Sequence, residues 1–497
     1  MITGLLIIAA LAILGWGFYR GLPLGKLGLV AWLQSVVLML PWLLLFGLVA
    51  VGIIPNLALI LFVLLLSVAV YIGLGKWLRA IAAQMPIPER SISERLEQPP
   101  STGEASPAES TADAAGSVAD ASEAPKAIPV PAEDLKAIQG IFGIETYFLT
   151  ETIPYQDGLI CKGNLRGEPA AVHARLSAAL QERLADQYRL FLVANPEGRP
   201  VVVILPSRND PQPANLTQKI TAGVLGLATI ATCLETSALL QGFNFYNAPG
   251  RWPEVLPIAF GLLAVLVTHE LGHRWLAKRY QVKLSPPFFI PAWQIGSFGA
   301  LTRFESLLPK RQVLFDIALA GPAAGGLLSL LLLIVGLVLS GPGSLFQVPG
   351  PFFQSSILVG SLARVVLGSA LQETLVSVHP LVVIGWLGLV ITALNLLPAG
   401  QLDGGRLIQA IYGRTVAGRS TIVVLIVLAI AAAFNPLALY WAIVILLLQR
   451  DLERPCLEEI SEVDDARAAW GLLALFLMAT TLIPLAPGLA GRLGIGG

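Results

Sequence analysis

The segment VLVTHELGHRW places two imidazoles and a carboxylate at a spacing that suits metal-assisted hydrolysis. His269 and His273 are four residues apart, so on a helix turning about 100° per residue both can reach one tetrahedral zinc ion. Glu270 faces the same site without having to bind the metal. A carboxylate there can accept a proton from water whose pKa zinc brings towards about 7. The pattern therefore predicts a zinc site with its own general base.

An interpretation without a metal also exists. Two histidines and a glutamate in an apolar helix could form a buried, hydrogen-bonded cluster. Polar groups at bilayer depth are costly, however, and those that occur usually serve a site. The whole chain has four histidines, and two of them fall in this one pattern. Metal binding is therefore the favoured interpretation.

A hydrolytic zinc site uses three protein ligands and keeps one position open for water. Asp403, in TALNLLPAGQLDGGRL, is the best third donor, because it follows an apolar segment that ends at the same membrane face as the helix of His269. His173 lies in a soluble segment, and His379 should start its span at the opposite face. Glu235 is a rival carboxylate, but its span should carry it towards the outer face. Taken alone, Asp403 before two glycines could also be a helix cap in a turn.

The composition indicates a membrane protein. Hydrophobic residues make up 55% of the chain and charged residues 13%, whereas soluble domains are about a quarter charged. Lys plus Arg and Asp plus Glu number 32 each, so the net charge excludes a nucleic-acid partner. The three cysteines are far apart and form no CxxC pair, so we expect neither a disulfide scaffold nor a cysteine zinc site.

We predict a polytopic α-helical membrane protein, a multi-span helical bundle with a small cytoplasmic α+β domain. Residues 1–79 predict an N-terminal membrane block of about three spans. Residues 86–131 are rich in Pro, Ser, Ala and Glu and predict a disordered acidic linker. Residues 132–213 have the strand and helix patterns of the α+β domain. Residues 217–488 predict the catalytic membrane domain.

The catalytic membrane domain contains several apolar segments long enough to cross a bilayer. These predict spans over residues 218–240, 255–275, 313–339, 380–397 and 468–485. A further segment, residues 421–448, is interrupted at Asn435 and Pro436. We interpret it as one kinked span, because a hairpin there would leave arms of only about 14 residues, short for a bilayer. Residues 355–371 could form an interfacial or re-entrant helix.

HELGH on one apolar helix and NLLPAGQLDGG on a later one resemble the site-2 protease family of intramembrane zinc metalloproteases. The stretch FGIETYFLTETIPYQDGLICKGNLRGEP more closely resembles the ethylene-dependent gravitropism-deficient and yellow-green proteases of chloroplasts and cyanobacteria. The resemblance implies one zinc ion held by His269, His273 and Asp403. It also implies Glu270 as the general base, with Asn395 positioning the substrate or stabilising the oxyanion.

Three other segments carry weaker signals. QIGSFGALTRF, residues 294–304, resembles the family's β-hairpin, which could pair with an unwound substrate strand, but it could also be a plain loop. GNLRG matches the closer group of proteases, although a structural turn is the favoured interpretation. DIALAGPAAGG has small residues at helical spacing, which lets neighbouring helices approach closely.

We therefore expect an enzyme that cleaves membrane proteins within or near the bilayer, with a membrane-protein substrate and the lipid bilayer as its partners. Two alternatives are a zinc-binding membrane carrier and a catalytically inactive scaffold. A carrier needs further polar ligands along its path, and the spans beside the histidines offer almost none. The intact His-Glu-His set argues against a scaffold.

The expected location is the plasma or thylakoid membrane of a photosynthetic bacterium. The resemblance indicates a photosynthetic lineage. The chain does not begin with a Ser-rich, Arg-rich transit segment, which favours a bacterial origin over a chloroplast one.

Overall fold

The computed structural model describes residues 130–495, apart from positions 156, 196, 434 and 450, together with scattered positions between residues 15 and 77. The N-terminal membrane block expected over residues 1–79 and the linker expected over 86–131 therefore lie almost wholly outside the described residues. The chain divides into two compact units, Met1–Ala119 and Asp120–Gly497. The second unit contains all the candidate site residues.

The first part of this unit is an antiparallel sheet with helices on one face. Its strands follow the order β1-β2-β4-β3, with bounds β1 Tyr147–Tyr155, β2 Gly158–Leu165, β3 Tyr188–Ala194 and β4 Pro200–Pro206. The accompanying helices are α4 (Ala132–Gln139) and α5 (Pro169–Leu184). Cys161 of β2, Leu192 of β3 and Val202 of β4 are fully buried against α5. They lie on one face of the sheet, because successive side chains of a strand point to opposite faces.

The GNLRG segment has a structural use in this sheet. A Cβ atom at Gly163 would lie 2.3 Å from the Phe148 carbonyl oxygen on β1, so only glycine fits between the strands there. Gly167 has a φ of 111°, which L side chains rarely adopt.

A short extended segment, residues 457–459, links this sheet to the helical part of the chain. The Leu192 N–H of β3 donates to the Leu457 carbonyl at 2.8 Å, and the Glu459 N–H donates back to the Leu192 carbonyl at 2.9 Å. On its other side, the Leu457 N–H donates to the Leu308 carbonyl at 2.8 Å. The segment therefore pairs with the edge of β3 and with the chain that leads into the membrane helices.

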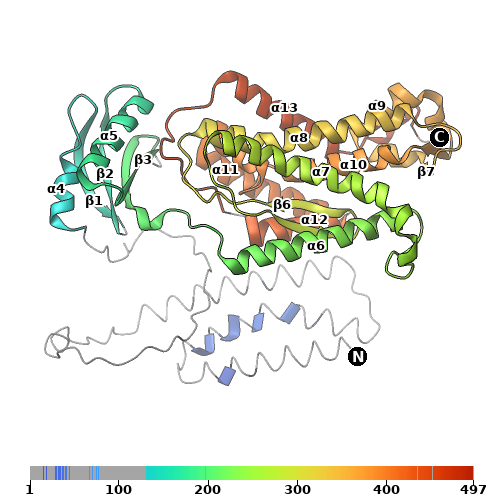
Figure 1. Cartoon of the computed structure of the whole chain (residues 1–497), viewed down its shortest axis with the longest axis horizontal. Coiled ribbons are helices and arrows are strands. Elements are labelled where there is room, and N and C mark those ends of the chain that lie inside the picture. The colour runs from blue at the N-terminus through green and yellow to red at the C-terminus, as the bar shows by residue number, and fades with distance from the viewer. Residues whose placement is uncertain are drawn as a thin grey trace. The chain divides into compact units, whose positions relative to one another are not determined.

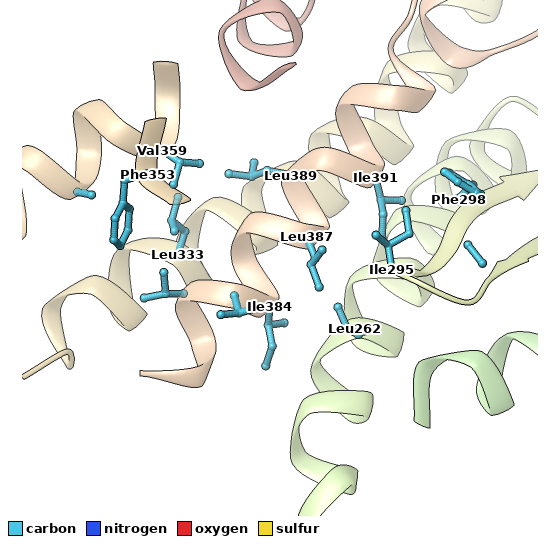
Figure 2. Close-up of a cluster of buried hydrophobic side chains, with 14 of the residues drawn as sticks. Leu262, Ile295, Phe298, Leu333, Phe353, Val359, Ile384, Leu387, Leu389 and Ile391 are labelled. Atoms are coloured by element: carbon cyan, nitrogen blue, oxygen red, sulfur yellow. The ribbon is translucent and has the colours of Figure 1, made fainter. Parts of the chain in front are cut away.

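The helical part confirms a polytopic membrane protein. Among the described residues, five helices are long and apolar enough to cross a membrane: α6 Leu216–Leu239, α7 Trp252–Arg279, α8 Arg311–Val338, α11 Asp403–Ala431 and α13 Asp465–Leu482. A shorter apolar helix, α10 (Pro380–Asn395), runs beside α7 and α8 (Figure 1). Figure 2 shows the apolar contacts that join them, among them Leu262 of α7, Leu333 of α8 and Leu387 of α10.

Smaller elements complete the unit. They are β5 Phe288–Ala292, β6 Gly296–Leu301, β7 Phe346–Pro349, α9 Ile357–Leu367, β8 Leu375–Val378, α12 Pro436–Val444 and α14 Pro487–Arg492. Strands β5 and β6 form an antiparallel hairpin that contacts α6, α7 and α10. Residues 294–304, which resemble the family's β-hairpin, contain only the second strand of this hairpin, β6. The first strand, β5, lies before them. Helix α9 falls within the segment expected to be interfacial or re-entrant.

The single kinked span expected over residues 421–448 is wrong, because the chain reverses there. Gly413 has a φ of 81° and breaks α11, so the apolar arm starts well before residue 421. Asn435 caps α12 by accepting from the Leu437 N–H at 3.0 Å. The returning arm ends in a π-helical turn, whose Gln449 carbonyl accepts from the Gln401 N–H at 3.0 Å. Because Gln401 lies just before the first residue of α11, the second arm ends beside the start of the first.

Candidate active site

Helix α7 brings the two histidines to a face that packs closely against α8. A Cβ atom at Gly321 of α8 would lie 2.1 Å from His273 Nε2, and one at Gly325 would lie 2.9 Å from His269 Cβ. On α7, a Cβ atom at Gly272 would lie 2.4 Å from the Ala320 carbonyl oxygen. The small residues of DIALAGPAAGG thus let the imidazoles fit between the helices.

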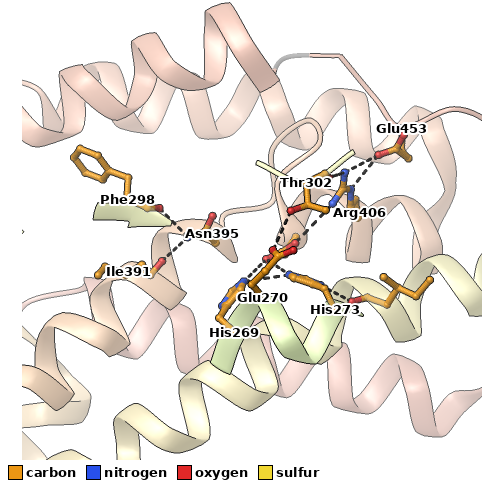
Figure 3. Close-up of polar contacts among 11 residues, drawn as sticks. His269, Glu270, His273, Phe298, Thr302, Ile391, Asn395, Arg406 and Glu453 are labelled. Carbon is orange, nitrogen blue, oxygen red and sulfur yellow. Dashed lines mark hydrogen bonds and ion pairs between the residues drawn. The ribbon is translucent and has the colours of Figure 1, made fainter. Parts of the chain in front are cut away.

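The structure brings His269, His273 and Asp403 together. Asp403 Oδ2 lies 3.2 Å from His269 Nε2 and 3.4 Å from His273 Nε2. The two Nε2 atoms are 3.2 Å apart, as the facing imidazoles in Figure 3 show. The Ile317 carbonyl can only accept, so His273 Nδ1 must donate to it, at 2.7 Å. The lone pair of His273 Nε2 therefore points into the cluster, as a metal ligand requires.

A tight turn carries Asp403 to the histidines. Helix α10 ends at Asn395, and α11 begins at Asp403 itself. A Cβ atom at Gly404 would lie 1.9 Å from the Leu396 carbonyl oxygen, and one at Gly405 would lie 2.2 Å from the Gly400 carbonyl oxygen. The two glycines after the aspartate are needed because the turn packs directly on the first residues of α11.

Glu270 is buried beside this cluster, with a hydrogen bond to one carboxylate oxygen and an ion pair to the other. Thr302 Oγ1 donates to Glu270 Oε2 at 2.9 Å, and Arg274 Nε lies 2.8 Å from Glu270 Oε1. The Arg274 partnership is readable in the sequence as an i, i+4 ion pair on one helix. Thr302 follows β6, and no local pattern marks it as a partner of Glu270.

Asn395 lies at the end of α10, against strand β6. Its side-chain amide donates to the Phe298 carbonyl at 3.0 Å and to the Ile391 carbonyl at 2.8 Å (Figure 3). It lines a small cavity together with His269 and Glu270. The amide therefore fixes β6 beside the site, and its role toward a substrate or an oxyanion stays a prediction.

The other candidate ligands lie elsewhere. Glu235 is fully buried near the end of α6, where it accepts from the Asn244 amide and from the Phe245 N–H at 2.9 Å. His173 lies in α5, with Nε2 3.2 Å from the Leu190 carbonyl oxygen. His379 caps the start of α10. Glu235 thus holds a turn that follows its own helix.

Two family models match the chain. The "EGY3 middle domain" matches residues 136–213, and "Peptidase family M50" matches residues 257–434. The rice protein "Probable zinc metalloprotease EGY1, chloroplastic" (Oryza sativa subsp. japonica) is 37% identical over 406 residues, which cover 74% of this chain and 70% of that protein. This chain belongs to peptidase family M50. The resemblance to the site-2 and gravitropism-deficient proteases is confirmed.

Other M50 relatives come from Arabidopsis thaliana. "Probable zinc metalloprotease EGY1, chloroplastic" is 37% identical over 401 residues, 73% of either chain. "Probable zinc metalloprotease EGY2, chloroplastic" is 39% identical over 363 residues, 71% of this chain and 65% of that protein. The chain thus spans slightly less than two thirds of the length of EGY2. No solved structure matches this chain.

The bacterial location expected from the sequence is wrong in the light of these relatives. Each of the three is named as a chloroplastic protein of a plant. The expectation rested on the composition of the first residues, and that composition does not determine the compartment.

Proposed function

We propose that this M50 chain is an intramembrane zinc metalloprotease, which cleaves peptide bonds of membrane proteins within or near the bilayer of a chloroplast membrane. The observation that carries the proposal is the convergence of His269, His273 and Asp403 on one point, with the Glu270 carboxylate beside the two histidines (Figure 3). Among the described residues, this is the one group of three or more potential ligands whose atoms all lie within 4.8 Å of one another. A carrier would need further groups along a path.

The donor set fits a single zinc ion. Two imidazole nitrogens and one carboxylate oxygen make the three protein ligands of a hydrolytic site and leave a fourth position for water. When bound there, zinc lowers the pKa of water and polarises the carbonyl of the bond to be cut. His269, His273 and Asp403 would hold the ion, and the Ile317 carbonyl would fix the tautomer of His273.

Glu270 would move the proton. In the proposed reaction its carboxylate accepts a proton from the attacking water and then delivers it to the leaving amine. The hydrogen bond from Thr302 orients Oε2, and the ion pair with Arg274 keeps the cation beside Oε1, which limits the reorganisation that the side chain needs during the reaction.

The lengths of the helices support a site inside the membrane boundary. Helix α10 has 16 residues. At about 1.5 Å per residue it is shorter than the roughly 30 Å hydrocarbon core. The turn between Asn395 and Asp403 would then lie at bilayer depth, where irregular backbone is tolerated only when buried in protein. Leu396, Ala399 and Leu402 in this turn are buried.

A substrate must present an unwound backbone, because a helix hides its carbonyls in hydrogen bonds. Strand β6 lies beside the site and could add such a segment as a further strand.

We propose residues 217–488 as the catalytic membrane domain and residues 132–213 as a separate soluble domain on its water-exposed side.

The packing of α8 against the histidines gives one test of the metal site. Gly321→Ala should lower zinc affinity at least about tenfold, because the new Cβ would displace the His273 ring. Gly326→Ala is the matched control, since its Cβ would meet only Thr392 Cγ2 at 3.4 Å. The measurement is the zinc content per molecule of both purified variants over a range of chelator concentrations, which gives the zinc affinity of each. Equal affinity in the two variants would contradict the proposed ligand geometry.

Membrane fragments give the test of function. We expect chloroplasts that carry the wild-type protein to contain fragments of membrane proteins cut within or beside apolar segments. In chloroplasts that carry Glu270→Gln, the same fragments should be missing and the uncut precursors should accumulate. Quantitative mass spectrometry of isolated membranes measures both. Identical fragment patterns would count against a protease.

A further inference from the structure

A buried ion pair between Arg406 and Glu453 lies beside the proposed zinc site (Figure 3). Both residues are only 7% exposed. Arg406 Nε donates to Glu453 Oε2 at 3.0 Å, and Arg406 Nη2 lies 2.9 Å from the same oxygen. The proposed set of three zinc ligands is complete without either residue.

The same guanidinium holds the residue that orients the general base. Arg406 Nη2 donates to the Thr302 carbonyl at 2.8 Å, and Thr302 Oγ1 donates to Glu270 Oε2 at 2.9 Å. Two consecutive hydrogen bonds therefore connect Arg406 to Glu270 through one residue. A shift of Arg406 would move Thr302 and, with it, the carboxylate.

Arg406 also faces the third proposed ligand. It lies three residues after Asp403 in the first turn of α11, with Nη1 4.0 Å from Asp403 Oδ1. The other oxygen, Oδ2, is the one that lies near the Nε2 atoms of His269 and His273. A cation beside Oδ1 favours the rotamer in which Oδ2 points at the imidazoles.

Glu453 is itself fixed to α11. Its backbone N–H donates to Gln409 Oε1 and its carbonyl accepts from Gln409 Nε2, both at 3.1 Å. Arg414 donates to the same carbonyl. Buried ion pairs contribute little to stability, because desolvation offsets their attraction, so a fixed geometry is the better explanation of this pair.

We propose that Arg406 and Glu453 are positioning residues. Together they set the orientation of the general base Glu270 relative to the zinc ligand Asp403. This inference rests on the proposed function and names residues that act on the same site without touching zinc or substrate.

The test uses the purified full chain in lipid vesicles, with Co²⁺ in place of zinc for spectroscopy. The variants are Arg406→Gln, Arg406→Lys, Glu453→Gln and the double Gln variant. Activity is measured on a designed peptide with one apolar span of about 20 residues that contains a central Asn-Pro-Gly break. The readouts are kcat, KM, thermal stability and the visible absorption spectrum of Co²⁺, which reports the ligand geometry.

We expect Arg406→Gln to lower kcat about 10- to 100-fold and to change KM less than about threefold, with an altered Co²⁺ spectrum. Arg406→Lys should recover only part of kcat, because lysine lacks the planar fork. The double variant should be no worse than Arg406→Gln alone, because the pair acts as one unit.

Arg311→Lys is the matched structural control. Arg311 is also 7% exposed and donates to the carbonyls of Ala410 and Ile411 in α11, but it does not contact Thr302 or Glu270. This variant should lose thermal stability and keep its kcat and Co²⁺ spectrum.

Wild-type kcat and an unchanged spectrum in folded Arg406→Gln would overturn the inference, and so would an equal loss of kcat in Arg311→Lys. If Arg406→Gln does not fold, Glu453→Gln decides by the same criteria. A wild-type protein that neither binds Co²⁺ nor cleaves would instead overturn the proposed function, so the two failures can be distinguished.

Discussion

Replacing Glu270 with glutamine should abolish cleavage and leave the zinc in place. The carboxylate lies beside the three proposed ligands, held by Thr302 and Arg274, and general bases contribute about 10²- to 10⁴-fold to rate. We therefore expect kcat to fall at least about 100-fold while the purified protein keeps one zinc per chain. Zinc content by elemental analysis and cleavage of the designed peptide, measured on the same preparation, check both parts.

His269→Ala is the contrasting variant, since it removes a proposed ligand and should lose both zinc and cleavage. If Glu270→Gln lost its zinc together with its activity, Glu270 would be a ligand and the assignment of the base would be wrong.

Replacing Asp403 with asparagine should reduce both zinc binding and cleavage sharply. The substitution keeps the shape of the side chain and removes the anionic oxygen that lies 3.2 Å and 3.4 Å from the two imidazole nitrogens. Loss of a direct ligand should cost more than the roughly 10- to 100-fold typical of residues behind the ligands. Zinc affinity by chelator competition and kcat on the designed peptide measure the effect.

Glu235→Gln is the matched control for Asp403→Asn, because Glu235 is a fully buried carboxylate inside another membrane helix. It binds Asn244 and the Phe245 backbone at the turn after α6, so its substitution should lower thermal stability and leave zinc unchanged. Full zinc and activity in Asp403→Asn, with loss of both in Glu235→Gln, would show that the third ligand had been misassigned.

The sequence predicts those parts of the site that depend on one element. His269, Glu270 and His273 lie on a single helix, so their spacing alone places them together. Asp403 is 134 residues away from His269, so its place beside the histidines follows only from combining the chemistry of zinc with the face at which each apolar segment ends. The four-stranded sheet can be predicted from the sequence because its strands alternate and its turns are short.

The parts that could not be predicted depend on contacts between distant loops. Thr302 follows β6, Arg406 lies in the first turn of α11 and Glu453 follows the arm that returns from α12, so they come from three separate parts of the chain. No local pattern in the sequence predicts that they meet. The reversal after α11 is rejected from the sequence because its arms, counted from residue 421, are too short for a bilayer. The positive φ of Gly413 breaks that helix inside a polar stretch, where hydropathy gives no sign of an arm beginning.

Removal and return of zinc test the central claim most directly. Wild-type protein in vesicles, stripped of metal by a chelator, should stop cleaving the designed peptide, and one equivalent of Zn²⁺ per chain should restore the original rate. Glu270→Gln should take up the same equivalent and stay inactive. Cleavage that continues at the original rate in protein shown to be free of zinc would contradict the account.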